Sequence, residues 1–225
     1  MLSLSMYVHL TILNCGCATA FEMSDMVRDL NVLQNRMAMG DRDARAEAAK
    51  KFDLIDEAIP AFEPETWKQE KNTRAAAIFL LAGGAPAHLC EAYDAEFLKP
   101  EYGDLISAAL EYAEAGGEGS QKLMEVDARS YSSVLAGHIA LVQGVAIAEK
   151  EKGKAVGLFD LARLSAPSSL IEEAALRREI ELLDLDHGAE KLITVINRYV
   201  EKYRQSPYAS AFWRRVFSVA QDALK

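Results

Sequence analysis

Apolar residues recur at every third or fourth position along nearly the whole chain after residue 22, which is the period of an α-helix with one buried face. The first stripe contains Met23, Met26, Val27, Leu30, Leu33 and Met37, and Gly40 ends it. No stretch alternates convincingly between apolar and polar residues with the period of two that marks a strand. The pattern therefore predicts an all-α fold.

Proline and glycine divide the rest of this pattern into further predicted helices. Pro60 ends the second helix, Gly83-Gly84 ends the third, and Pro86 begins a short fourth. The expected helical ranges are 42–59, 65–82, 103–115, 131–151, 154–165, 170–185 and 188–204, with a last helix from about 207. Because the connections in the second half are short, neighbouring helices there are expected to pack as antiparallel hairpins.

One predicted pair of helices resembles half of a tetratricopeptide-like unit. The pattern A-x3-F…P, in which small Ala lets two helices approach and Pro closes the second helix, is matched by Ala155, Phe159, Ala162 and Pro167. The preceding helix lacks the Trp, Leu-Gly and Tyr positions of that repeat. Gly188-Ala189 nevertheless follows Lys154-Ala155 by 34 residues and again opens the second helix of a pair. These features favour tetratricopeptide-like helical repeats in the second half, with an irregular bundle as the alternative.

The first 20 residues have a different composition from the rest of the chain. They contain no Asp, Glu, Lys or Arg, include the apolar run 4–13, and end in the small-x-small motif Ala18-Thr19-Ala20. We interpret 1–20 as a signal peptide and 21–225 as an all-helical domain, or as two subregions at about 21–120 and 121–225. A signal normally carries a basic residue ahead of its apolar run, so a misplaced start codon and an uncleaved anchor stay open.

Composition and charge exclude several classes of partner. The chain has 225 residues, 50% of them hydrophobic, with a formal net charge of -9. This leaves no basic surplus for nucleic acid or an anionic membrane surface, and Arg214-Arg215 is too small a basic group to change that conclusion. No apolar run after the predicted signal is long enough to span a membrane. We therefore expect neither a nucleic-acid partner nor a membrane span after signal cleavage.

The histidines and cysteines indicate no catalytic, cofactor or metal site. The four histidines, at positions 9, 88, 138 and 187, lie in separate segments, and none has a second ligand at the i, i+4 spacing of a helical metal site. His138 is expected at the start of an apolar helix and His187 at a turn, both in structural roles. Cys15 and Cys17 lie in the predicted signal, and Cys90 is expected to be a buried thiol.

The adjacent carboxylates Glu172 and Glu173 are expected to be structural. Neighbouring helical residues point about 100° apart, so they do not form a shared acid/base pair. They follow Ser168-Ser169 at a predicted helix start, and Arg177-Arg178 lies one turn further on, as in salt-bridged surface helices. We therefore predict no enzyme, no cofactor and no small-molecule substrate.

Four segments resemble one known family. The runs "GHIALVQG" (137–144) and "KAVGLFDLARLSAPSSLIEEAALRREI" (154–180) are similar to the MotC family of periplasmic motility proteins, which are found with the MotA/MotB flagellar motor. "VRDLNVLQNRMAMGD" (27–41) and "RAAAIFLLAGGAP" (74–86) are similar to the N-terminal region of that family. The segment 154–180 is the distinctive one.

The resemblance implies an exported, non-enzymatic protein of the periplasm that acts on the periplasmic part of the stator protein MotB and is needed for flagellar rotation. Members of that family carry a further C-terminal region, so the resemblance also implies a shortened chain. The alternative is a generic periplasmic helical-repeat adaptor unrelated to motility, which the neighbouring genes would distinguish. A helical enzyme is more remote, because the His and Cys positions do not converge.

Overall fold

The structure is a computed structural model that describes residues 22–116 and 121–222, and within these ranges it contains helices and no strand. The prediction of an all-α fold is thus confirmed. The predicted signal peptide, 1–20, lies outside the described residues. The division of 21–225 into two subregions stays a prediction.

The helices begin and end close to the predicted stops. The α-helices are α1 Met23–Ala38, α2 Asp43–Ala58, α3 Pro64–Trp67, α4 Glu70–Leu81, α5 Ala87–Asp94, α6 Gly103–Glu114, α7 Gln121–Glu125, α8 Ser133–Ile147, α9 Lys152–Ser165, α10 Leu170–Leu182, α11 Leu185–Lys202 and α12 Ala209–Asp222. Short 3-10 turns lie at Ile59–Ala61 (η1), Pro100–Tyr102 (η2) and Ala128–Ser130 (η3).

One predicted helix, 65–82, is wrong, because the chain breaks into α3 and α4 at Gln69 (φ -78°, ψ 124°). The side chains of Asn72 and Thr73 fold back and donate hydrogen bonds to the carbonyl oxygens of Thr66 and Trp67, both at 2.8 Å. These bonds hold a turn that an uninterrupted helix would not allow. The break turns Trp67 into the core, where it is 1% exposed.

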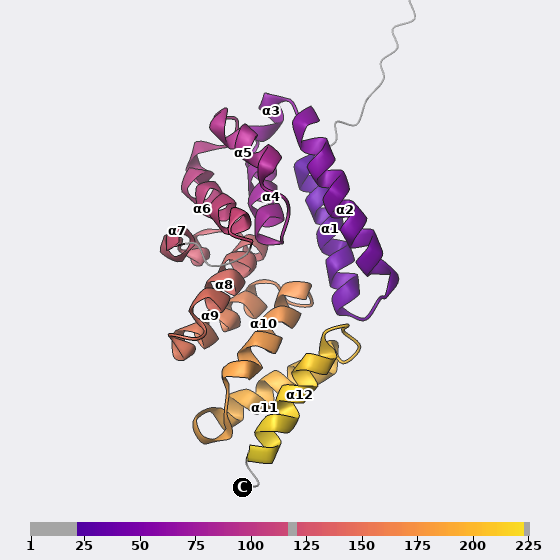
Figure 1. Cartoon of the computed structure of the whole chain (residues 1–225), viewed down its shortest axis with the longest axis vertical. Coiled ribbons are helices and arrows are strands. Elements are labelled where there is room, and N and C mark those ends of the chain that lie inside the picture. Colours follow the sequence, from indigo (N-terminus) through magenta and orange to yellow (C-terminus); the bar gives the residue numbers. More distant parts are fainter. Residues whose placement is uncertain (1–21, 117–120, 223–225) are drawn as a thin grey trace, which may run out of the picture.

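The expected antiparallel packing in the second half is confirmed for two pairs. Across α8 and α9, Gly137 lies against Ala166, and Gly144 against Phe159. Across α10 and α11, Glu172 pairs with Arg198, and Glu179 with Lys191. In each pair a step forward along one helix is a step back along the other. Figure 1 shows the pairs stacked along the long axis of the molecule. A regular tetratricopeptide-like repeat stays a prediction.

Two cores hold the helices together. The larger one runs from α1 to the first half of α10, and the smaller one joins the rest of α10 to α11 and α12. Ala38, at the end of α1, belongs to the smaller core. The Leu170 amide also donates a hydrogen bond to Asn35 Oδ1 (3.0 Å), and Gly40 packs on Gln205. The α1–α2 hairpin therefore closes onto the C-terminal helices, which lie below it in Figure 1.

Candidate partner-binding site

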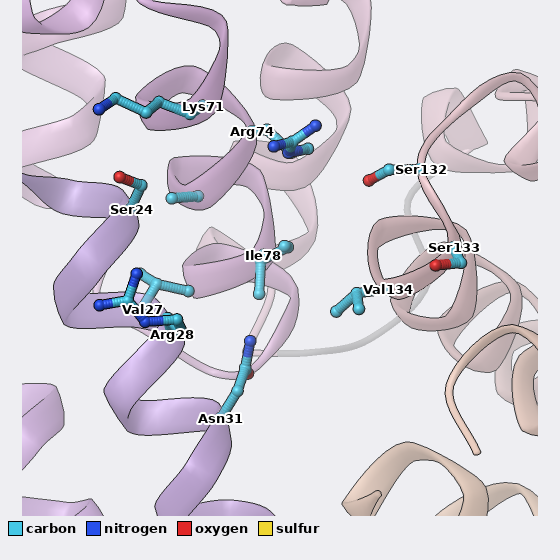
Figure 2. Close-up of a pocket in the computed structure, with 11 residues that line it drawn as sticks. Ser24, Val27, Arg28, Asn31, Lys71, Arg74, Ile78, Ser132, Ser133 and Val134 are labelled. Carbon is cyan, nitrogen blue, oxygen red and sulfur yellow. The ribbon is translucent and has the colours of Figure 1, made fainter.

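A groove opens between α1, α4 and the start of α8, three segments that lie far apart in the sequence. Its volume is about 330 Å³. Figure 2 shows Arg28 and Asn31 on α1, Arg74 on α4, and Ser132 and Val134 on the facing wall. The fold of the larger core thus brings together residues that no sequence motif connects.

The base of the groove is apolar and its rim is polar. Val27 and Ile78 line it and are 2% and 7% exposed, whereas Val134 on the opposite wall is 41% exposed. Ser132 is the N-cap residue of α8, but its side chain makes no capping hydrogen bond. Its hydroxyl is therefore available to another partner.

Three cationic side chains line this groove, Arg28, Lys71 and Arg74. Arg28 lies 2.7 Å from Asp25 and Arg74 lies 3.8 Å from Glu70, in pairs whose side chains are all more than a third exposed. Lys71 pairs with Glu22. Exposed ion pairs of this kind contribute little to stability and exchange readily, so the cations can bind an incoming anion.

A second group of charges lies inside the protein, on α10. Glu172 is 2% exposed and accepts hydrogen bonds from two nitrogens of the Arg198 guanidinium, Nε at 2.6 Å from Oε1 and Nη2 at 3.1 Å from Oε2. Oε2 also accepts hydrogen bonds from the Tyr203 hydroxyl (2.7 Å) and the Ser168 amide (2.6 Å). Burial opposes ionisation, but these donors outweigh it and lower the pKa of Glu172.

Glu173 is fully buried and is held by the C-terminal helices. Its Oε1 accepts hydrogen bonds from the Tyr199 hydroxyl (2.8 Å) and the Ser206 hydroxyl (3.1 Å), and Arg177 Nε lies 3.5 Å away. The prediction that this carboxylate pair belongs to a surface helix is therefore wrong. The face of α10 that carries both carboxylates is covered by α11 and the segment that follows it.

Glu179 is also fully buried, but no side chain donates a hydrogen bond to its carboxylate. Lys191 Nζ lies 3.1 Å from one carboxylate oxygen and Arg163 Nε 3.5 Å from the other, but neither contact has hydrogen-bond geometry. Both cations also pair with Asp160. Burial raises the pKa of Glu179, Asp160 raises it further, and Lys191 and Arg163 only partly offset them.

The histidines do not come together in the described part of the chain. His138 lies inside α8, not at its start as expected, and is 4% exposed. Burial lowers its pKa to about 4, so the imidazole is neutral at physiological pH. His88 is partly buried. His9 and the side chain of His187 lie outside the described residues. Among those described, no three His, Cys, Asp or Glu side chains could hold a metal ion.

Cys90 is partly buried, and its thiol lies 3.3 Å from Glu114 Oε1, to which it donates a hydrogen bond. Burial and this carboxylate raise the pKa of the thiol to about 11. The thiolate, which is the nucleophilic form of cysteine, is therefore scarce at neutral pH. The sequence predicted a buried thiol, and the structure finds this one only partly buried.

The described residues define an all-α protein of antiparallel helical pairs, with a cation-lined groove on its surface and buried carboxylates engaged by neighbouring side chains. The chain belongs to the MotC family, because the family model described as "Chemotaxis protein MotC" matches residues 7–225. The family resemblance seen in the sequence is thus confirmed.

A curated relative agrees with this assignment. The chain is 29% identical over 189 residues to Chemotaxis protein MotC of Rhizobium meliloti (strain 1021), which is 83% of this chain and 43% of that protein. The chain therefore spans less than half the length of this relative. No solved structure matches the chain significantly. None of the described helices combines the length and apolar character that crossing a membrane requires.

Proposed function

We propose that this protein is an exported, non-enzymatic motility protein that is needed for flagellar rotation and acts by binding the periplasmic part of the stator protein MotB. Membership of a family named for chemotaxis, with a match over residues 7–225, carries the proposal. The uncharged, apolar segment that ends at Ala18-Thr19-Ala20 supports export.

The chemistry of the described side chains supports binding over turnover. The carboxylates that come together on α10 are occupied by Arg198, Tyr203 and Tyr199 and face the interior. A general acid or base needs a group that reaches substrate, and these do not. Packed helical hairpins instead present a fixed surface, and that is how helical-repeat proteins hold partners.

Gene deletion and co-purification test this proposal. In the deletion strain we expect assembled flagella by electron microscopy and loss of normal swimming, restored by the intact gene. The mature protein should co-purify with the periplasmic domain of MotB, and mass spectrometry should find Phe21 at its N-terminus. Normal swimming in the deletion strain, with expression of the gene shown in the parent, would contradict the motility role. Loss of swimming without co-purification would contradict the proposed contact with MotB but would still support the motility role.

A further inference from the structure

We propose that the groove between α1, α4 and the start of α8 binds an acidic segment of a partner protein. Of the described residues that line the groove, three are cationic and none is anionic, although the chain as a whole carries a formal net charge of -9. Each cation pairs with a carboxylate beside the groove, Asp25, Glu22 or Glu70, but only the cations line it. A lining whose charged groups are all cationic favours and orients an anionic partner.

Two of the cations, Arg28 and Arg74, lie in ion pairs that are open to solvent on both sides. Arg28 and its neighbour Asp25 are 68% and 52% exposed, and Arg74 and Glu70 are 36% and 56% exposed. Water and salt screen such pairs strongly, so an incoming carboxylate replaces an existing one at little cost. Arg28 and Arg74 also carry planar guanidinium groups, which bind carboxylates with two parallel hydrogen bonds.

The shape of the groove favours a peptide over a small anion. Its volume of about 330 Å³ far exceeds that of a phosphate or acetate ion, and the cations are spread along one side of it, as Figure 2 shows. Val27 and Ile78 at its base and Val134 on the facing wall offer apolar contact between the charged positions. An extended segment that alternates acidic and apolar side chains places both kinds of group where they are bound.

Fluorescence anisotropy with a defined peptide tests the proposal without depending on which protein is the partner. The probe is a fluorescein-labelled peptide of alternating Glu and Leu, and the control peptide has Gln in place of Glu. We expect the mature protein to bind the first peptide saturably at low salt and about tenfold more tightly than the second, with weaker binding as salt rises. Absence of saturable binding would overturn the proposal.

Two matched double variants locate the binding. Arg28→Glu with Arg74→Glu reverses two groove cations, whereas Lys154→Glu with Arg178→Glu reverses two exposed cations elsewhere that also pair with a carboxylate on their own helix or next to it. Both change the net charge equally. We expect the groove variant to bind the acidic peptide at least about tenfold more weakly and the control variant within about twofold of wild type.

Three measurements keep this test decisive. Melting curves confirm that both double variants are folded, and Arg28→Gln with Arg74→Gln replaces the groove variant if it is not. Equal weakening by both double variants would overturn the proposal, because the effect would then be one of net charge. Displacement of the peptide by inorganic phosphate or free glutamate at the peptide's own concentration would also overturn it, since the groove would then be a small-anion site.

Discussion

Between α8 and α9 the close contact is made by glycine, alanine and phenylalanine, whereas between α10 and α11 buried carboxylates and the side chains that bind them lie beside an apolar core. Ala155, Phe159 and Ala162 on α9 are all 0% exposed. A Cβ added at Gly144 would lie 2.6 Å from the Phe159 ring. The α8–α9 pair therefore depends on volume, because its two backbones approach only where side chains are absent or small.

The α10–α11 pair depends on chemical identity instead. Glu172 requires the guanidinium of Arg198 and the hydroxyl of Tyr203, and Glu173 requires the hydroxyl of Tyr199. A buried carboxylate without these donors would be an uncompensated charge. The two pairs have the same antiparallel geometry, but only the second combines its apolar core with buried charges, each of which needs its own donors.

The largest expected effect comes from Phe159→Ala in the volume-dependent pair. Removing a fully buried ring leaves a cavity that the packed helices cannot fill, so we expect the free energy of unfolding to fall by about 4 kcal/mol. Urea denaturation measures it. Leu164→Ala, at a position 69% exposed on the same helix, should cost less than about 0.5 kcal/mol. Similar losses in both variants would show that α9 does not pack through Phe159.

Arg198→Met tests the dependence on identity in the other pair. It leaves Glu172 buried without its two guanidinium bonds, and we expect a loss of about 3 kcal/mol in the free energy of unfolding. Arg178→Met, which removes an exposed pair with Glu181, is the matched control and should cost less than about 0.5 kcal/mol. If the two variants unfold at the same denaturant concentration, the buried pair is not what joins α10 to α11.

The same contrast explains what the sequence could predict. Helix positions follow from period and from Gly and Pro stops, and the Ala155–Phe159–Ala162 pattern identified α9 because apolar spacing is visible in a single segment. The break at Gln69 was missed, since it depends on side chains of Asn72 and Thr73 that bind backward. Charged residues at i, i+4 spacing normally face water, so the pattern placed Glu173 and Arg177 on the surface.

The partners of the carboxylates and the walls of the groove could not be found in the same way. Tyr199 lies 26 residues from Glu173, and Ser206 lies 33 residues from it, so only the folded chain brings them together. Arg28, Arg74 and Ser132 likewise come from three separate helical segments. The hydrogen-bonding residues Arg198, Tyr199, Tyr203 and Ser206 follow one another closely at and after the end of α11, but nothing local shows that they face the interior.

Lowering the pH should reduce the free energy of unfolding through a group in the α8–α9 pair at a higher pH than through Glu172 in the α10–α11 pair. His138 on α8 has a folded pKa of about 4, below its usual 6.5, so the neutral imidazole stabilises the fold. That contribution is complete above the unfolded pKa and is lost as pH falls towards 4, by about 2 kcal/mol between about pH 7 and pH 4.5. Glu172 has a lowered pKa, so the stability that its ionised form contributes is lost only as the pH falls below the usual carboxyl pKa.

Urea denaturation of wild type and His138→Leu at about pH 7 and about pH 4.5 measures how much stability each protein loses in acid. The variant should lack the loss between neutral pH and about pH 4.5, because it has no imidazole to protonate. Subtracting one protein from the other cancels the contributions of Glu172 and Glu179, which have opposite signs. Parallel acid profiles would mean that His138 is not the group that titrates.

The smallest expected effect comes from substituting two glycines with alanine. Comparing the two is the most direct test of close approach between α8 and α9. Gly144→Ala places a methyl group against Phe159, which is fully buried and cannot turn away. Overpacking of this kind outweighs the gain in helix propensity, so we expect a net loss of about 1 kcal/mol. Gly157→Ala, in α9, meets no atom within 4 Å and should stabilise by about 0.5–1 kcal/mol. Opposite signs would confirm that α8 needs glycine where it faces Phe159, and equal stabilisation by both would show that the helices have room to spare.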